Sequence, residues 1–149
     1  QVLEFNARFG DPESQALLVR LETDLVQIMN SVVEGTLEEE EITWSQDAAV
    51  CVILASGGYP KSFQTDYPIS GLERVPGEVM VFHSGTTRKD GALFTAGGRV
   101  LGVTARGETL EKAIEKAYGA CEQIVFPQRH FRIDIAWRAL HRDRLGKGL

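Results

Sequence analysis

The chain has 149 residues, of which 43% are hydrophobic, enough for one domain with a packed core or for one domain and part of a neighbour. Its formal net charge of −5 gives no electrostatic reason to expect binding to nucleic acid or to an anionic membrane. No apolar run approaches the roughly 20 residues that cross a bilayer, and the two cysteines form no zinc or redox motif, so we expect a cytoplasmic protein.

The chain begins with alternating apolar and polar residues, a pattern that predicts a β-strand. Side chains two residues apart on a strand point to the same face, so we expect Glu4, Asn6 and Arg8 to project together. Carboxylate and amide oxygens are ligands that Mg²⁺ accepts, and a guanidinium can bind a phosphate or an acyl phosphate. The residues by themselves leave two interpretations open, a metal and phosphate site or an ordinary surface strand.

The next residues predict a long helix. Asp11 is a suitable N-cap, Pro12 suits the first turn, and Glu13 lies near the positive end of the helix dipole. Apolar residues then recur at helical spacing, so we expect one helix over about residues 12–34 that ends at Gly35. Its apolar face is broad and should be buried against another surface. The N–H groups at its start can receive an anion, although Asp11 can simply cap them.

A connector with four consecutive glutamates follows, and we place a domain boundary after residue 40. Beyond it, apolar runs bounded by glycines and prolines predict the short antiparallel strands of an α+β domain. The turn Lys89-Asp90-Gly91 predicts a hairpin, and the pattern after Gly107 predicts an amphipathic helix of about 15 residues. The expected strands are residues 48–56, a short one near Ile69, residues 78–86 and two segments within 93–107.

The segment FRIDIAWRAL, residues 131–140, predicts a final strand or a passage from strand to helix. Arg132 and Asp134 are two residues apart and share a face, which favours an internal salt bridge or a domain contact over contact with a substrate. Cys51 and Cys121 lie in apolar patterns, so we expect both to be small buried side chains that form no disulfide.

Three further features have both a structural and a functional interpretation. His83 follows a predicted strand, where it can make a structural hydrogen bond or lie near a pocket. The pairs Gly57-Gly58 and Gly97-Gly98 can cradle a phosphate, but without a phosphate-loop pattern they are more typical of turns or close packing. Arg99 beside the second pair is a candidate for contact with a ligand phosphate.

Several segments in a fixed order carry a family resemblance, namely EFNARFGDPE, ASGGYP, VFHSGT, GGRVLGVTARG and FRIDIAWRAL. Together they resemble the C-terminal portion of the phosphoribosylamine–glycine ligases, also called glycinamide ribonucleotide synthetases, of the ATP-grasp superfamily. The resemblance covers about residues 2–140. It implies an α+β fold in two parts, the end of an ATP-grasp domain with a strand and long helix over residues 1–40, and a small C-terminal domain of antiparallel strands with one main helix over residues 41–149.

The resemblance also implies roles for residues near the start of the chain. A strand with the pattern Glu-x-Asn supplies ligands for Mg²⁺ or Mn²⁺ at the ATP phosphates in ATP-grasp ligases, which gives this role to Glu4 and Asn6. A basic residue two positions later faces the acceptor or the acyl phosphate, which makes Arg8 a catalytic and substrate-binding candidate. The loop beside the substrate pocket would contain three more candidates for substrate binding, Gly10, Asp11 and Glu13.

The implied reaction is the ATP-dependent joining of glycine to 5-phosphoribosylamine through glycyl phosphate, giving glycinamide ribonucleotide, ADP and phosphate in purine biosynthesis. The nucleotide cleft and the N-terminal domain of the family have no counterpart in these motifs, so we expect the chain to need those domains and to be inactive alone. Two other classes stay open, a different ATP-grasp carboxylate–amine ligase or carboxylase, and a non-catalytic interaction module.

Overall fold

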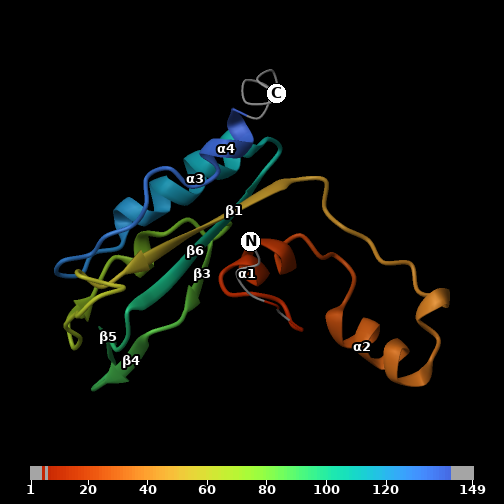
Figure 1. Cartoon of the computed structure of the whole chain (residues 1–149), viewed down its shortest axis with the longest axis horizontal. Coiled ribbons are helices and arrows are strands. Elements are labelled where there is room, and N and C mark those ends of the chain that lie inside the picture. Colours follow the sequence, from red (N-terminus) through yellow and green to blue (C-terminus); the bar gives the residue numbers. More distant parts are fainter. Residues whose placement is uncertain (1–4, 6, 142–149) are drawn as a thin grey trace.

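The computed structural model describes residue 5 and residues 7–141 of the chain (Figure 1). The helices are α1 (Glu13–Leu18), α2 (Leu25–Glu34), α3 (Leu110–Gln123) and α4 (Trp137–Leu140), with short 3-10 turns η1 (Leu37–Glu39) and η2 (Leu72–Arg74). The strands are β1 (Ala48–Ala55), β2 (Pro68–Ile69), β3 (Met80–His83), β4 (Thr86–Lys89), β5 (Ala92–Thr95) and β6 (Arg99–Gly107). None of the helices in this part of the chain has the length and apolar character needed to cross a membrane.

The core is built on an antiparallel sheet in the order β1–β6–β3. Val52 of β1 lies opposite Val103 of β6, Leu54 lies opposite Leu101, and all four side chains are fully buried. Branched apolar residues of this kind favour strands because they pack well on a pleated surface. The sheet therefore forms from two long apolar runs that are far apart in the sequence.

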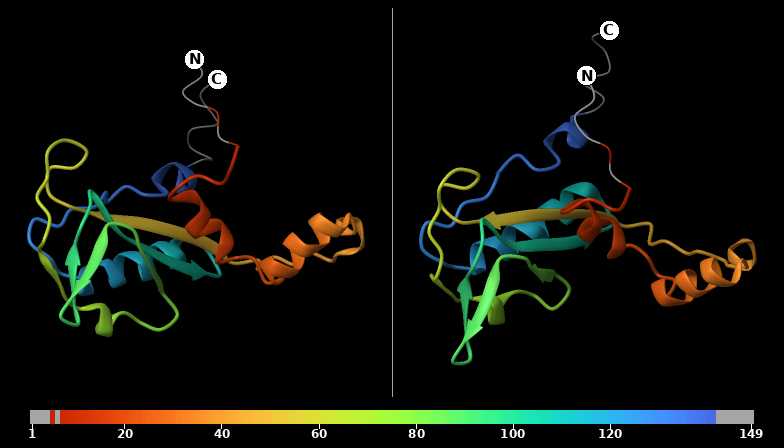
Figure 2. Two further views of the ribbon diagram at one scale, coloured as in Figure 1. Left: turned by 90° about the horizontal axis from the view of Figure 1, so that it is seen from below. Right: turned by 60° about the horizontal axis from the view of Figure 1, so that its bottom comes forward.

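Helices cover both faces of this sheet (Figure 2). The helix α3 packs on β6 and β1 through small buried side chains, among them Ala113, Ala117 and Ala120. The hydroxyl of Thr109 caps its first turn by accepting a hydrogen bond from the N–H of Lys112. The short helix α1 contacts β1 and β6 from the other side. The central strand β6 is buried on both faces for this reason.

A second antiparallel sheet has the order β2–β5–β4. The strands β4 and β5 are joined by Asp90 and Gly91, whose φ angles are +47° and +82°. Two central residues with positive φ are typical of the tight hairpin turn that matches the twist of the strands. The hairpin predicted at Lys89-Asp90-Gly91 is confirmed, as are the strand near Ile69 and the α+β class. The strand predicted over 48–56 is confirmed as β1, one residue shorter.

The single helix predicted over residues 12–34 is wrong, because the chain leaves helical geometry between α1 and α2. There it pairs with the connector: Leu21 forms a bridge with Trp44, and the N–H of Ser45 donates to the carbonyl of Arg20 at 2.8 Å. Asp24 starts the second helix by accepting from the N–H of Val26 at 2.7 Å. The predicted end at Gly35 is confirmed, with a φ of +75°.

The predicted cap at Asp11 is also wrong, since α1 begins at Glu13 with Pro12 in the cap position and no side-chain cap. A further correction concerns residues 131–135, which belong to no strand. The Tyr118 hydroxyl satisfies their backbone instead, donating to the carbonyl of Arg132 at 2.7 Å and accepting from the N–H of Ile135 at 3.1 Å. The helical part of the prediction corresponds to α4.

Both cysteines are free thiols, as predicted, with Cys121 fully buried and Cys51 half-buried. Burial raises the pKa of Cys121 to about 12, because the thiolate would lose its hydration. We therefore expect Cys121 in a Cys51→Ala variant to resist a thiol reagent at pH 8 and to react once urea unfolds the chain. Reaction in the folded chain at the rate seen in urea would contradict this burial. The absorbance of the thiolate that the reagent releases measures the reaction rate in the folded and in the unfolded chain.

Candidate functional site

The predicted substrate loop forms a tight turn at the start of α1. The N–H of Gly10 donates to Oε1 of Glu13 at 2.8 Å, and the N–H of Ser14 donates to the carbonyl of Gly10 at 3.0 Å. A methyl group on Gly10 would lie 2.7 Å from Cδ of Glu13, so a glycine permits this close approach. Two predicted site residues, Gly10 and Glu13, are thereby brought into contact.

Arg99 fixes the same turn to the central sheet. Its Nη1 donates to the carbonyl oxygen of Asp11 at 2.9 Å, and its Nη2 lies 3.4 Å from Oδ2 of Asp11. Arg99 is the first residue of β6 and 88 positions from Asp11, so this contact joins the start of the chain to the sheet. The guanidinium that the sequence suggested for a ligand phosphate is engaged with Asp11 in this structure.

The two predicted metal ligands, Glu4 and Asn6, lie outside the described residues. The predicted opening strand is wrong for its described part, because residue 5 and residues 7–10 belong to no strand. Arg8 is exposed, and its Nη1 donates to the carbonyl of Phe9 at 3.0 Å. Among residue 5 and residues 7–141, no cluster of three or more histidine, cysteine, aspartate or glutamate side chains could hold a metal ion. The structure therefore brings Gly10, Asp11 and Glu13 together in one turn. The assignment of Glu4 and Asn6 as metal ligands rests on the sequence alone.

The glycine pairs have the structural role that the sequence favoured. A methyl group on Gly98 would lie 2.1 Å from the ring of Tyr59, and one on Gly85 would lie 2.6 Å from Cα of Gly97. Ser56 ties the two turns together, because its Oγ donates to the carbonyl of Gly97 at 2.8 Å and its N–H donates to that of Gly98. Close packing therefore accounts for Gly85, Gly97 and Gly98.

His83 ends β3 and makes a structural hydrogen bond, since its Nδ1 lies 3.0 Å from Oγ1 of Thr86. This contact fits the simpler of the two interpretations of His83. It also places the imidazole on the turn between β3 and β4, two strands that belong to different sheets.

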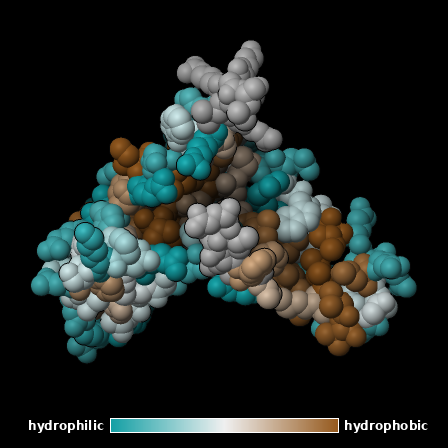
Figure 3. Space-filling view, viewed as in Figure 1, coloured by the Kyte–Doolittle hydropathy of each residue, from teal (hydrophilic) through white to brown (hydrophobic). Residues whose placement is uncertain are grey.

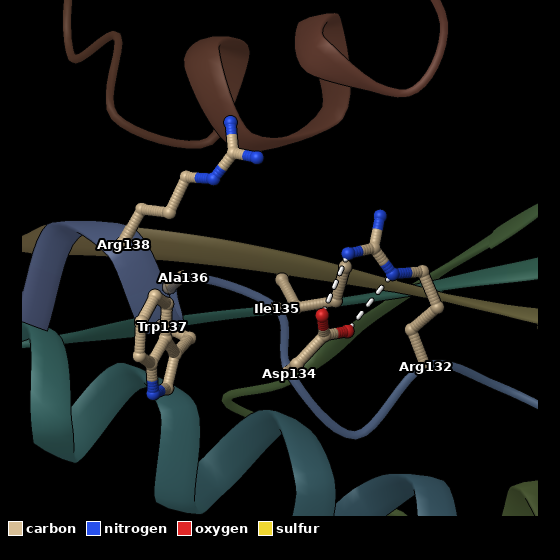
Figure 4. A pocket seen from close by; sticks show the side chains of 6 residues that line it. All are labelled: Arg132, Asp134, Ile135, Ala136, Trp137 and Arg138. Carbon is tan, nitrogen blue, oxygen red and sulfur yellow. Dashed lines mark hydrogen bonds and ion pairs between the residues drawn. The ribbon is translucent and has the colours of Figure 1, made fainter.

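A cavity of about 460 Å³ lies along the segment that leads into α4 (Figure 4). Arg132 and Asp134 form the predicted salt bridge, in which Nε and Nη2 donate to the two carboxylate oxygens at 2.9 and 2.8 Å. Arg138 lines the same cavity and points away from this pair. Trp137 also lines the cavity and stacks on His141, with ring centroids 4.8 Å apart. Sequence reasoning gave no role to Trp137 or Arg138.

The Arg132 guanidinium lowers the pKa of the Asp134 carboxyl, chiefly through its hydrogen bonds to the ionised form. Such a group favours the folded state above its unfolded pKa, and the effect is lost as the pH falls through the folded pKa. We expect Arg132→Ala to return the Asp134 pKa toward the usual value of about 3.9. Arg138→Ala should produce a smaller rise, because the charge of Arg138 lowers the Asp134 pKa less than the hydrogen bonds from Arg132 do. Carboxyl chemical shifts in an NMR titration would measure both, and equal rises would contradict the assignment.

The fold is an α+β domain whose central sheet carries the turn of the predicted substrate loop, and it matches a known class of domain. Residues 49–138 match the family described as "Phosphoribosylglycinamide synthetase, C domain". The match covers more than half of the chain, so the chain belongs to this family.

Relatives extend this similarity to almost the whole chain. The chloroplastic phosphoribosylamine–glycine ligase of Arabidopsis thaliana is 46% identical over 97% of this chain, and the ligase of Caldanaerobacter subterraneus is 48% identical over 91%. A solved structure of the ligase from Thermotoga maritima superposes on 89% of the chain with a TM-score of 0.71 and 36% identity. The chain spans 28%, 32% and 32% of these three proteins, about a third of their length.

Proposed function

We propose that the chain serves as the C-terminal part of an ATP-dependent ligase that joins glycine to 5-phosphoribosylamine through glycyl phosphate. The observation that carries this proposal is the identity of 46% over 97% of the chain with a protein named phosphoribosylamine–glycine ligase. The product would be glycinamide ribonucleotide, with ADP and phosphate, and the domains that bind ATP would lie in the rest of the ligase. Cytoplasmic location stays a prediction, since the Arabidopsis relative is described as chloroplastic.

The division of the chain into two parts belongs to the same proposal. Residues 1–40 would complete the ATP-grasp domain and residues 41–149 would form the C-terminal domain. The family match from residue 49 onward supports a boundary near this point. Because α1 packs on β1 and β6, the two parts would share a contact surface at the start of the chain.

Glu4 and Asn6 would hold Mg²⁺ or Mn²⁺, because a carboxylate and an amide oxygen are hard ligands that suit either ion. The bound ion would neutralise charge on the ATP phosphates. Arg8 would bind the acyl phosphate or the acceptor through its exposed guanidinium. The turn of Gly10, Asp11 and Glu13 would position the bound substrate, with Arg99 holding the turn against the sheet.

The test is ADP formation by the full-length ligase that carries this chain, in the presence of ATP, Mg²⁺, glycine and freshly made phosphoribosylamine. We expect ADP release to require both glycine and phosphoribosylamine, and we expect the 149-residue chain alone to release none. Activity that ignores phosphoribosylamine would assign the chain to another ATP-grasp ligase. Glycine-dependent ADP release by the chain alone would contradict the need for further domains.

Arg99→Ala in the full-length ligase should lower kcat/KM for phosphoribosylamine about 10-fold, equivalent to about 1.4 kcal/mol, because the turn at Asp11 loses its anchor. Folding stability should hardly change, since an exposed ion pair contributes little. Arg99→Lys should give a kcat/KM between those of the unmutated ligase and of Arg99→Ala, because lysine cannot make both contacts that the guanidinium makes with Asp11. The control is Arg106→Ala, an exposed arginine on the same strand. Steady-state kinetics that show equal losses in both alanine variants would remove the positioning role.

A further inference from the structure

The cavity beside α4 has a lining to which the proposed function gives no role. Its volume of about 460 Å³ lies within the range of about 300–1,000 Å³ that is typical of small-molecule sites. One short stretch of the chain supplies this lining, namely Arg132 and residues 134–138. Figure 3 shows a hydrophilic surface around α4, whereas the most apolar surface in this view lies over α2. Polar surroundings of this kind suit a charged ligand, which would keep polar partners there.

The backbone of this stretch is held in an uncommon conformation. Ala136 has a φ of +66°, in the left-handed region that residues other than glycine rarely adopt. The hydroxyl of Tyr118, which belongs to α3, fixes the preceding residues by its hydrogen bonds to the backbone of Arg132 and Ile135. Conformations of this kind cost free energy and cluster at binding and active sites, where the surroundings hold them in place. The cavity wall is therefore organised before any ligand binds.

Asp134 is an oriented carboxylate that keeps acceptor positions for a ligand. Arg132 donates one hydrogen bond to each of its two oxygens, which fixes the plane of the carboxylate. An ionised carboxylate has about four lone-pair sites, so these two bonds leave others open. The Asp134 side chain is 57% exposed, and a ligand can reach it from the solvent. Two neighbouring oxygens match two neighbouring hydroxyl groups, such as the 2- and 3-hydroxyls of a ribose.

Arg138 supplies a cation for an anionic group. It lines the cavity and points away from Arg132 and Asp134, and it makes no hydrogen bond or ion pair in the part of the chain that the structure describes. A guanidinium can bind a phosphate through two parallel hydrogen bonds. The charge of Arg138 also lowers the pKa of Asp134, so the two groups act on one another across the cavity. A ligand that carries both a phosphate and hydroxyl groups can therefore contact both side chains.

Trp137 adds a flat apolar wall to these polar groups. Its ring stacks on that of His141, with an angle of 25° between the planes, and this contact holds the indole in place. The Trp137 residue is nevertheless 49% exposed, so part of its surface is open to a ligand. An aromatic face covers the C–H groups of a sugar ring well, because both surfaces are apolar. The hydroxyls and the phosphate of the same ligand can then keep their polar partners.

We propose that this cavity binds a phosphorylated pentose, with Arg138 on the phosphate, Asp134 on the ring hydroxyls and Trp137 against the sugar ring. The choice of a pentose phosphate rests on the proposed function, because phosphoribosylamine and glycinamide ribonucleotide both contain one. Inorganic phosphate is a poorer ligand, since it would bring an anion beside the Asp134 carboxylate without the hydroxyl groups of a sugar to donate to it.

Calorimetric titration of the full-length ligase with ribose 5-phosphate tests the cavity without turnover. We expect Arg138→Ala to weaken binding about 30-fold, because a charge-assisted contact is lost. Arg106→Ala should bind as the unmutated ligase does, since Arg106 is exposed and does not line this cavity. Asp134→Asn should reduce the preference for ribose 5-phosphate over 2-deoxyribose 5-phosphate. Trp137→Phe should remove the fluorescence change that accompanies binding, which locates the ligand beside the indole.

An unmutated ligase that does not bind ribose 5-phosphate would overturn the proposal, and this result holds even if a variant fails to fold. Equal affinities for ribose 5-phosphate and inorganic phosphate would also overturn it, because the pentose would then contribute nothing.

Steady-state kinetics identify the source of the pentose. A higher KM for phosphoribosylamine in Arg138→Ala, at an unchanged kcat, would support the proposal with the substrate as the ligand. An unchanged KM together with lost binding of ribose 5-phosphate would support it with a separate phosphorylated pentose as the ligand. ADP formation that ignores phosphoribosylamine would refute the proposed function alone, because the calorimetric result does not depend on the reaction.

Discussion

Asn6→Ala in the full-length ligase is expected to lower glycine-dependent ADP formation about 100-fold, equivalent to about 2.7 kcal/mol of activation free energy. The reason lies in the pair Glu4 and Asn6, whose spacing would put two oxygen ligands on the same face of the strand that the sequence predicts. Loss of the amide oxygen weakens the site where Mg²⁺ would neutralise the ATP phosphates. Because the defect is one of metal binding, a higher Mg²⁺ concentration should restore part of the rate.

Two companion variants make this result specific to the metal ligand. Asn6→Asp keeps an oxygen at the same position and should lose much less activity than the alanine variant. Glu38→Gln removes a carboxylate from the exposed connector and should leave the rate unchanged. If Asn6→Ala keeps its activity at low Mg²⁺, the metal assignment is wrong, while the substrate requirements of the ligase still stand.

The sequence predicts those parts of the fold that depend on local patterns. The strand β1 is a continuous apolar run, the turn at Asp90 and Gly91 has hairpin chemistry, and α3 has a clear amphipathic period. Each of these signals is contained within a few neighbouring residues and agrees with the burial that the fold gives them. Local preference and tertiary packing act in the same direction, and the predictions succeed for this reason.

The break between α1 and α2 could not be predicted in the same way. The apolar spacing continues across it, so the period alone favours one helix. What breaks the helix is pairing with a distant segment, in which Leu21 meets Trp44 and the carbonyl of Arg20 accepts from Ser45. Asp24 was the available local signal, because it is a strong N-cap in the middle of the expected helix.

The candidate site also has a part that local sequence predicts and a part that depends on a distant contact. The types and spacing of Glu4, Asn6 and Arg8 are visible in the sequence, since they alternate within five consecutive residues. The anchor that Arg99 provides for Asp11 joins residues 88 positions apart, and no local pattern contains it. The sequence did single out Arg99, but for a ligand phosphate, because a cation beside two glycines is a familiar phosphate signal.

The largest loss of stability is expected from Leu54→Ala, which should lower the free energy of unfolding of the 149-residue chain by about 3 kcal/mol. Leu54 is fully buried in β1 opposite Leu101, in the layer between the central sheet and α3. Removing most of its side chain leaves a cavity between the central sheet and α3. The neighbouring strands and the helix can close this cavity only in part. Urea unfolding followed by circular dichroism measures the change.

Val33→Ala is the matched control, because Val33 is an aliphatic residue that the 149-residue chain leaves exposed on α2. We expect its effect to stay within about 0.5 kcal/mol in the isolated chain. If Leu54→Ala costs no more than Val33→Ala in the isolated chain, then β1 and β6 do not form its stabilising core.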